Sequence, residues 1–340
     1  MTNQFKNCLN NLLDGKNLSV SDMESLMELI MTGKLTSAQI ASCIVAMEIK
    51  GHTIDEITSA ASIMRKHSNQ VYLDNSNHLI DTCGTGGDSL QTFNVSTVSA
   101  IISSAAGARV AKHGGRSVSS KCGSADVLET LGVNVNLNHE ELGKLVDGIG
   151  IGFMFAPNYH PAMKFVAPVR KELAVKTIFN ILGPLTNPAS AKCQLVGVSD
   201  KKLTIVFAKV LQKLGSKHVV VVHGEDGMDE ISITGKTFIA ELKNNEISEY
   251  TIDPSLFGLK KGNLEDIIVT DSEHSKNIIL DILAGNSSVA RDIAVLNAGA
   301  AIYVSGLTKD INTGILMAQE KIDDGKALNK LNQLIEASNA

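Results

Sequence analysis

The sequence predicts an α/β protein with a small all-helical domain followed by a large α/β domain, in which helices flank a central, mostly parallel sheet. Two observations lead to this prediction. Residues 1–73 carry capped, amphipathic helical patterns and no β-rich run. From residue 79 onward, short β-rich runs alternate with helical pieces, which is typical of a parallel sheet covered on both faces.

The helical pattern of residues 1–73 has start and stop signals. Three pairs have the capping-box pattern, in which a hydroxyl residue is followed three positions later by an acidic or amide residue: Ser19–Asp22, Thr36–Gln39 and Thr53–Glu56. Three glycines stand where helices are expected to end: Gly15, Gly33 and Gly51. Apolar residues at helical spacing, such as Ile40, Ile44 and Met47, indicate either a domain core or a subunit interface.

The α/β region is expected to contain six strands, helical pieces between them and one hairpin. The strands are expected at 79–81, 108–111, 133–135, 151–155, 193–198 and 218–222. Helices are expected at 98–106, 200–214 and 288–304. Residues 237–252 predict an antiparallel hairpin with Lys243, Asn244 and Asn245 in its turn.

Composition excludes several classes of protein. A formal net charge of −5 argues against general affinity for nucleic acid or for an anionic membrane. The five cysteines are odd in number and show no C-x-x-C spacing, so we expect reduced thiols in a cytoplasmic protein, with neither zinc nor disulfides. No apolar run reaches the ~18 residues of a membrane span.

The most informative motif is LIDTCGTGGDSLQTFNVST at residues 79–97. Closely spaced glycines let backbone N–H groups approach an anion and can adopt positive φ. The hydroxyl residues after them open the predicted helix, whose N-terminus would face the same anion. The motif indicates a phosphate or diphosphate site, and a tight turn that binds nothing is the alternative. It matches neither the P-loop nor the dinucleotide-binding pattern.

A second motif, AKHGGRSVSSKCGSA at residues 111–125, places Lys112, His113, Arg116 and Lys121 among glycines and serines. Such a loop suits a ligand with several negative charges, and a solvated basic loop is the alternative. Both motifs directly follow an apolar strand. Open α/β sheets bind their ligands at the carboxyl ends of neighbouring strands.

The third motif is acidic. In HVVVVHGEDGMDE at residues 218–230, an apolar strand runs into several carboxylates that include Asp229 and Glu230. Carboxylates are ligands that Mg²⁺ accepts when substrate phosphates complete its shell. An acidic hairpin turn is the alternative, and the two anion-type loops favour a metal site.

Four ordered blocks resemble the signature of the anthranilate phosphoribosyltransferase family: DTCGTGGDSLQTFNVST, KHGGRSVSSKCGSADVLETLG, HPAMKFVAPVRKELAVKTIFNILGPLTNP and VHGEDGMDE. The resemblance covers nearly the whole chain. It implies the step of tryptophan biosynthesis in which anthranilate displaces pyrophosphate from phosphoribosyl pyrophosphate (PRPP), giving N-(5-phosphoribosyl)anthranilate. It also implies Mg²⁺ and a homodimer formed by the helical domain.

The resemblance also implies which residues form the site. The PRPP-binding set is Gly84, Gly87, Asp88, Thr92, Asn94, Val95, Ser96, Thr97, Lys112, His113, Gly114, Gly115, Arg116, Ser117, Val118, Ser119, Ser120 and Ser124. The anthranilate-binding set is Gly84, His113, Gly115, His160 and Arg170. The metal set is Ser96, Asp229 and Glu230.

Two further expectations follow from the resemblance. The family usually has Asn where this chain has Gly115, so one hydrogen-bonding group near the acceptor is lost. Residues 160–189 are expected to form a helix with Pro161 in its first turn and an interruption at Gly183 and Pro184. The resemblance implies that this segment, about 164–190, crosses back to the helical domain as a hinge. The helical domain would then comprise 1–73 and about 164–190, and the α/β domain would comprise 74–163 and 191–340.

Two other functions are weighed against this one. A pyrimidine nucleoside phosphorylase would share the architecture and the anion-type loops but would bind free phosphate and a nucleoside. A non-catalytic relative would use its basic loops to bind nucleic acid, although the acidic pair and the negative charge argue against it. No Ser-His-Asp or Cys-His pattern indicates a covalent intermediate, so catalysis is expected to rest on positioning and electrostatics.

Overall fold

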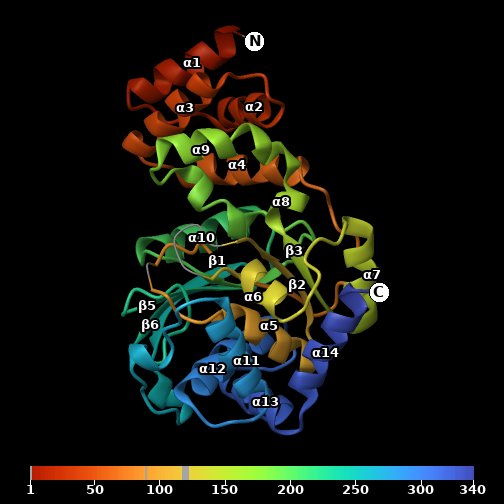
Figure 1. Cartoon of the computed structure of the whole chain (residues 1–340). Coiled ribbons are helices and arrows are strands. Elements are labelled where there is room, and N and C mark those ends of the chain that lie inside the picture. Colours follow the sequence, from red (N-terminus) through yellow and green to blue (C-terminus); the bar gives the residue numbers. More distant parts are fainter. Residues whose placement is uncertain (1, 89, 117–121) are drawn as a thin grey trace.

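The computed structural model describes residues 2–88, 90–116 and 122–340. It has a helical bundle at one end and an α/β body at the other (Figure 1). The bundle contains α1 (Thr2–Leu13), α2 (Val20–Met31), α3 (Ser37–Lys50) and α4 (Ile54–Lys66). The predicted fold class is therefore confirmed.

Two of the three predicted capping boxes form, and at Ser19 only one of the two bonds of a box, that from the Asp22 N–H, is present. Thr36 and Thr53 form reciprocal capping boxes with Gln39 and Glu56. Ser19 accepts the N–H of Asp22 at 3.1 Å. The three glycines that were expected to end helices all have positive φ, between 66° and 84°.

One seven-stranded sheet forms the centre of the body, in the order β3-β2-β1-β4-β5-β6-β7. Five strands are parallel: β1 (Leu79–Gly84), β2 (Arg109–Gly114), β3 (Ile151–Phe155), β4 (Cys193–Gly197) and β5 (His218–Gly224). The predicted hairpin forms β6 (Thr237–Lys243) and β7 (Glu246–Ile252), antiparallel to β5 and to each other. Asn244 and Asn245 make its turn with positive φ, which suits a two-residue hairpin loop.

The strand predicted at 133–135 is wrong. Val133 and Val135 are buried and the residue between them is exposed, which imitates the alternation of a strand. The backbone N–H of Asn134 instead donates to Ser338 Oγ at the end of the last helix. The segment is a loop whose apolar side chains fill the core without joining the sheet.

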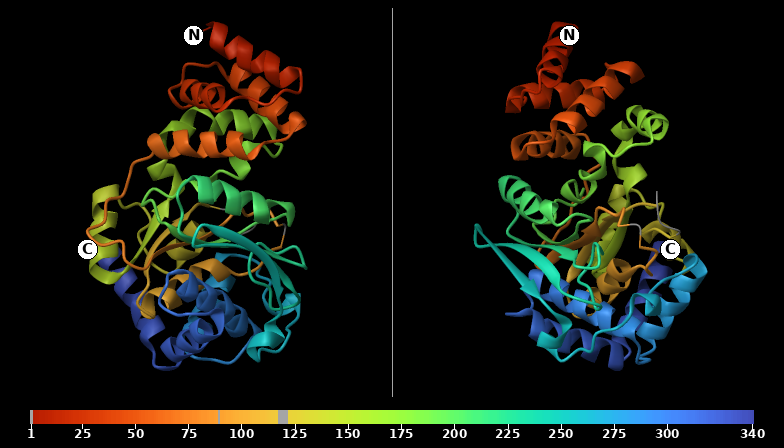
Figure 2. Two further views of the ribbon diagram at one scale, coloured as in Figure 1. Left: turned by 180° about the vertical axis from the view of Figure 1, so that it is seen from behind. Right: turned by 90° about the vertical axis from the view of Figure 1, so that its left-hand side faces the viewer.

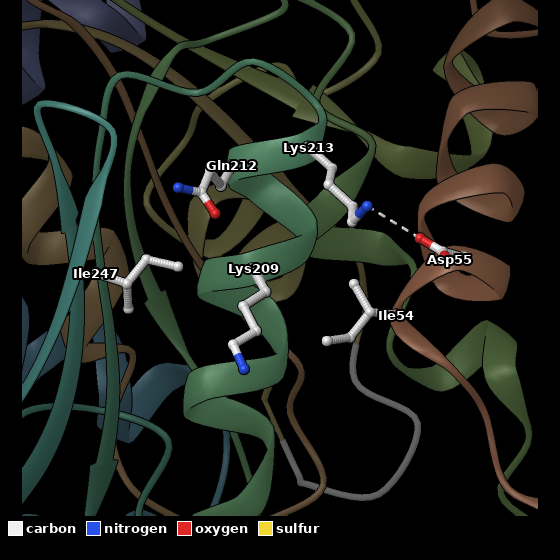
Figure 3. Close-up of a pocket in the computed structure, with 6 residues that line it drawn as sticks. All are labelled: Ile54, Asp55, Lys209, Gln212, Lys213 and Ile247. Carbon is white, nitrogen blue, oxygen red and sulfur yellow. Dashed lines mark ion pairs between the residues drawn. The ribbon is translucent and has the colours of Figure 1, made fainter.

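Helices cover both faces of the sheet (Figure 2). Helix α9 (Ala167–Leu173) lies with the bundle, against α3 (Figure 1). The helices of the body are α5 (Val95–Ala105), α6 (Ser124–Thr130), α7 (His139–Ile149), α8 (Ala156–Tyr159), α10 (Lys202–Lys213), α11 (Ser272–Leu283), α12 (Val289–Val304), α13 (Ile311–Asp323) and α14 (Lys326–Ser338). The first of these begins three residues before the predicted start at Val98. No helix in the described ranges is long and apolar enough to cross a membrane.

Alternate residues of the sheet belong to two hydrophobic cores. Val220 and Val222 of β5 pack in one core with α5 and α12. Val219 and Val221 pack in the other, which also contains α10 and the apolar residues of the helical bundle. The core of the bundle is therefore continuous with one face of the sheet.

The segment between β3 and β4 is not one helix. It consists of α8, the 3₁₀ helix η1 (Pro161–Phe165), α9 and two more 3₁₀ turns, η2 (Ile178–Asn180) and η3 (Gly183–Leu185). Two 3₁₀ turns occur later in the chain, η4 (Pro254–Phe257) and η5 (Leu264–Asp266). Ala174 ends α9 with a φ of 51°. The segment packs on α2 and α3 of the bundle, as a hinge that crosses back would require. The chain limits of the two domains stay a prediction.

The end of β4 allows a test of the fold. A Cβ added to Gly197 would lie 1.5 Å from the backbone oxygen of Asp229, which is far too close for two atoms that are not bonded. We expect Gly197→Ala to displace that backbone and to lower the free energy of unfolding by ~1–3 kcal/mol or more. Thermal and urea unfolding measure this loss.

Gly148→Ala is the matched control. Gly148 lies inside α7 without a positive φ, and a Cβ there would meet no atom within 4 Å. We expect this change to stabilise the protein by roughly 0.5–1 kcal/mol, since alanine favours a helix. Equal stability of the two variants would contradict the close approach at β4.

Candidate functional site

The three motifs meet at the carboxyl edge of the parallel strands. Four of the five parallel strands end in glycine: Gly84, Gly114, Gly197 and Gly224. From β1 the chain continues to β2 and β3 on one side, and it returns on the other side at β4. This reversal of strand order is where open α/β sheets bind ligands.

The acidic loop after β5 lies directly against the first glycine-rich loop. Asp229 Oδ2 accepts the N–H of Gly86 at 2.8 Å. A Cβ on Gly84 would lie 2.6 Å from the same carboxylate oxygen, so the contact requires glycine there. Gly86 and Gly87 both have positive φ, which fits the predicted anion-type loop. The structure thus brings together two motifs about 140 residues apart.

The same loop contacts the N-terminus of α5. Glu230 Oε1 accepts the N–H of Ser96 at 3.0 Å, in the first turn of that helix. Asn94, the N-cap residue, makes no side-chain capping bond. A carboxylate therefore lies at the helix end where the sequence predicts an anion site, and where free N–H groups favour negative charge.

Three partly buried carboxylates, those of Asp88, Asp229 and Glu230, interact electrostatically. Burial and then the charge of Asp229 raise the pKa of Asp88 to about 7. The same two causes raise the pKa of Glu230 to about 8. Burial also raises the pKa of Asp229. Crowded carboxylates with raised pKa values favour a cation between them.

The donor set fits Mg²⁺ only with help from a ligand. Across the described ranges, no three His, Cys, Asp or Glu side chains already form a metal site. Hard carboxylate oxygens are nevertheless the donors that Mg²⁺ prefers, and Mg²⁺ usually completes its shell with water and substrate phosphates. These residues therefore fit a metal that arrives with a phosphorylated ligand.

Lys112 is a buried cation whose charge interacts with Asp229 and Glu230. Its Nζ donates to the Thr82 carbonyl and to Ser96 Oγ, the latter at 3.0 Å. Burial lowers the pKa of Lys112, and the charges of Asp81 and Glu230 among others raise it. The lysine thus lies between β1 and the start of α5, as a phosphate-binding role requires.

Asn94 is held by residues that the sequence did not single out for this role. Its Oδ1 accepts the Ser275 hydroxyl at 2.9 Å and the Cys122 thiol at 3.0 Å. Ser275 lies on α11, 181 residues away, and no local pattern points to it. Nearby, Thr92 forms an isolated bridge with Ile268. Val95 and Thr97 are buried in the first turn of α5.

The second glycine loop is described in part. Ser117, Val118, Ser119 and Ser120 lie outside the described residues. Arg116 pairs with Asp126 at 2.8 Å and with Glu129 at 2.6 Å, both on α6. It is therefore directed toward α6, and Ser124 begins that helix. A Cβ on Gly115 would meet nothing within 4 Å, and its φ is not positive.

Two histidines predicted for the acceptor lie together. The rings of His113 and His160 are 5.0 Å apart between centroids. His113 Nε2 and both ring nitrogens of His160 are buried and have no hydrogen-bond partner among the described residues. Burial lowers the pKa of His113 to about 3, helped by His160, and that of His160 to about 4. Both rings are neutral at physiological pH and offer unused polar atoms.

Arg170 on α9 differs from the other arginines. The chain has five, and four of them bond to a carboxylate or to a backbone carbonyl. Arg170 has no such partner in the described structure, and burial lowers its pKa. A half-buried guanidinium without an anion is suited to a carboxylate ligand.

Two family models match the chain. The model described as "Glycosyl transferase family, a/b domain" matches residues 76–328, and "Glycosyl transferase family, helical bundle domain" matches residues 6–68. Curated relatives include the anthranilate phosphoribosyltransferases of Laribacter hongkongensis and Methylobacillus flagellatus. The first is 53% identical, covering 96% of each chain. The second is 51% identical, covering 98% of each chain.

Solved structures agree with these matches. The anthranilate phosphoribosyltransferase of Thermus thermophilus superposes with a TM-score of 0.93 at 35% identity, covering 98% of this chain and 99% of its own. The enzyme of Saccharomyces cerevisiae, solved in complex with PRPP and Mg, gives 0.90 at 28% identity with 98% of each chain covered. The same yeast enzyme with 4-fluoroanthranilate gives 0.88 at 27% identity, again with 98% of each chain covered. The chain belongs to the anthranilate phosphoribosyltransferase family.

Proposed function

We propose that this protein transfers the phosphoribosyl group of PRPP to the amino group of anthranilate, giving N-(5-phosphoribosyl)anthranilate and pyrophosphate for tryptophan biosynthesis. Full-length similarity to enzymes of that name supports the proposal. The observation that carries it is the contact of Asp229 and Glu230 with the glycine-rich loop and the start of α5. This contact places two carboxylates that are suited to Mg²⁺ beside a loop that is suited to a diphosphate.

The PRPP side of the proposal uses the first glycine loop, the N-terminus of α5 and Lys112. Gly84, Gly87 and the first turn of α5 would present backbone N–H groups to the diphosphate. Lys112 would supply a buried positive charge. The PRPP set also includes residues between Gly114 and Ser124. Four of these lie outside the described residues, and they are proposed on the resemblance alone. Arg116 would have to leave α6 to reach a phosphate.

Magnesium is proposed as the cofactor, with Ser96, Asp229 and Glu230 holding it directly or through water. Bound there with the diphosphate, it would supply positive charge to the leaving group. The crowding of Asp88, Asp229 and Glu230 supports this assignment because a cation relieves their repulsion. The yeast relative solved with PRPP and Mg supports it as well.

The acceptor side would comprise Gly84, His113, Gly115, His160 and Arg170. Arg170 would bind the anthranilate carboxylate as a fork, and the neutral histidines would border the ring. The amine of anthranilate is a free base at neutral pH, so no strong general base is needed. Rate acceleration would come from aligning the amine with ribose C1 and from stabilising the departing diphosphate.

The larger organisation is also proposed. The helical domain would comprise 1–73 and about 164–190 and would form a homodimer face, while 74–163 and 191–340 would bind PRPP. The packing of the returning segment on α2 and α3 supports this division. The five free cysteines support a reducing, cytoplasmic location.

The overall test is loss of anthranilate fluorescence in the presence of PRPP and Mg²⁺. We expect transfer with anthranilate and no phosphorolysis of thymidine or uridine. Phosphorolysis without transfer would favour the phosphorylase alternative. PRPP binding without transfer would indicate that Gly115 accompanies a different aromatic acceptor.

The metal assignment is tested by the double variant Asp229→Asn and Glu230→Gln. Both changes keep the shape and remove the negative charge, so we expect PRPP turnover to be abolished while the fold is retained. Steady-state kinetics and circular dichroism measure the two properties. Glu225→Gln, on the exposed part of the same loop, is the control and should keep full activity. Turnover by the double variant at saturating Mg²⁺ would reject the metal role.

The acceptor assignment is tested by two opposite changes. Gly115→Asn restores about one neutral hydrogen bond of ~0.5–1.5 kcal/mol, so the KM for anthranilate should fall by up to roughly tenfold. The open space and the ordinary φ at Gly115 allow this residue. Arg170→Ala should raise the same KM much more, because a charged hydrogen bond is lost.

Lys171→Ala is the control for the arginine, since it removes an exposed neighbouring cation on the same helix. The KM for PRPP should change little in all three variants. An Arg170→Ala enzyme with normal KM for anthranilate would refute the carboxylate role.

A further inference from the structure

The pairing of β1 with β2 stops early. The two strands pair at Leu79 with Arg109 and at Ile80 with Val110, although β1 runs on to Gly84 and β2 to Gly114. From the next position on, backbone hydrogen bonds of the ladder give way to a side-chain bond. The Oδ1 atom of Asp81 accepts the N–H of His113 at 3.0 Å. Asp81 is fully buried. The position of His113 relative to β1 is therefore set by a side chain.

The second oxygen of Asp81 reaches a third strand. Gln194 on β4 donates from Nε2 to Asp81 Oδ2 at 3.4 Å and to the Pro184 carbonyl at 2.9 Å. Two acceptors face the same amide nitrogen, so the NH₂ group has to point toward them. The other end of the amide, Oε1, is buried without a partner among the described residues. Cys83 Sγ lies 3.9 Å from the same Nε2 as a weaker third acceptor, so the amide is oriented by Asp81, Pro184 and Cys83.

Pro184 belongs to the turn of residues 183–187, which buried side chains hold from three directions. Gln194 bonds to its Pro184 carbonyl, and Arg65 Nε from α4 donates to the Leu185 carbonyl at 2.7 Å. Within the turn, Asn187 Nδ2 donates a hydrogen bond to the Ala111 carbonyl of β2 at 2.9 Å. The turn is therefore tied to the bundle, to β4 and to β2 at once.

This turn lies beside the two histidines of the candidate acceptor site. The backbone of Gly183 is next to the His113 ring, and the backbone of Thr186 is next to the His160 ring. Asp81 thus contacts the acceptor side twice, through the His113 N–H and through Gln194. Asp81 also interacts with the charge of Lys112 on the PRPP side, whereas no hydrogen bond of Gln194 in the described structure reaches a residue of the PRPP set.

We propose that Asp81 and Gln194 form a positioning pair that sets the acceptor subsite by fixing the 183–187 turn against His113 and His160. The pair holds the wall of the subsite and touches neither substrate. This inference rests on the proposed function, because it assigns the histidines to the anthranilate side. It predicts an effect on one substrate and not on the other, which a purely structural role would not produce.

The test uses Gln194→Met, which keeps the volume and removes the hydrogen bonds donated to Asp81 and Pro184, together with the weaker one to Cys83. We expect the KM for anthranilate to rise about three- to tenfold, the effect of one or two neutral hydrogen bonds, with the KM for PRPP changed less than about twofold. Hydrogen exchange at the amides of Leu185 and Thr186 should become faster, because the turn is released on one side.

A second variant and a control complete the design. Asp81→Asn still accepts the His113 N–H but presents an NH₂ group to Gln194, so it should also raise the KM for anthranilate and speed exchange in the turn, even if the first variant folds poorly. Because it also removes a charge that faces Lys112, selectivity between the two substrates is judged on Gln194→Met. Ser103→Ala removes a buried hydroxyl that bonds within α5 and to α12, far from the turn. It should change neither KM nor the exchange of the turn.

The measurements test the positioning pair and the proposed function separately. Faster exchange in the turn together with a selective rise in the KM for anthranilate supports the positioning pair. Unchanged exchange, or equal rises in both KM values, overturns it. Absence of transfer by the unmodified protein would refute the proposed function, and in that case the exchange measurement still decides whether the pair holds the turn.

Discussion

The site depends on the approach of the acidic loop to the ends of β1 and β4. Asp229 lies so close to Gly84 and Gly197 that neither position has room for a side chain. That contact places a carboxylate on the N–H of Gly86 and its neighbour on the N–H of Ser96. The glycines are therefore needed for packing between loops as well as for access to an anion.

Charge balance follows from this packing. The close approach removes solvent from three carboxylates, and their pKa values rise because burial and mutual repulsion disfavour the charged form. Lys112 is a single buried countercharge for them in the described structure, and it is shared with Asp81. The site is thus arranged for a ligand that carries its own cations and several anionic oxygens. The proposed acceptor side differs, since its histidines are neutral and Arg170 would supply its positive charge.

Much of the fold could be predicted from the sequence because its signals are local. The capping residues Thr36 and Thr53, the paired asparagines of the hairpin turn and the alternation of strands with helices all act within a few residues. The false strand at 133–135 shows the limit of such reasoning, since burial of alternate valines does not require a ladder. Helix α5 begins at Val95 and not at Val98, so its first turn includes Ser96 and Thr97, two polar residues that the apolar pattern leaves out.

The sequence could indicate the meeting of the motifs where one motif carries the residues, as for Asp229 and Glu230, whose roles stay a proposal. It was not predictable where contacts span distant elements. Ser275 supports Asn94 from 181 residues away, and Gln194 supports Asp81 from 113 residues away. No local sequence pattern marks Ser275 or Gln194, because the sequence around a buried amide or hydroxyl does not indicate where its hydrogen-bond partner lies. Arg116 was expected to bind a phosphate, and in the structure it pairs with Asp126 and Glu129 of α6. Residue spacing in the sequence does not reveal that these carboxylates compete for the arginine.

The hairpin has a consequence for how the molecule behaves among its copies. Strand β7 is the last in the sheet order, and its outer N–H and C=O groups face no further strand in the described structure. An exposed strand edge is a template for pairing with other chains. Glu246 and Glu249 are exposed on it, and like charges would meet if two such edges came together. The open edge of the sheet is thereby protected against aggregation by its own side chains.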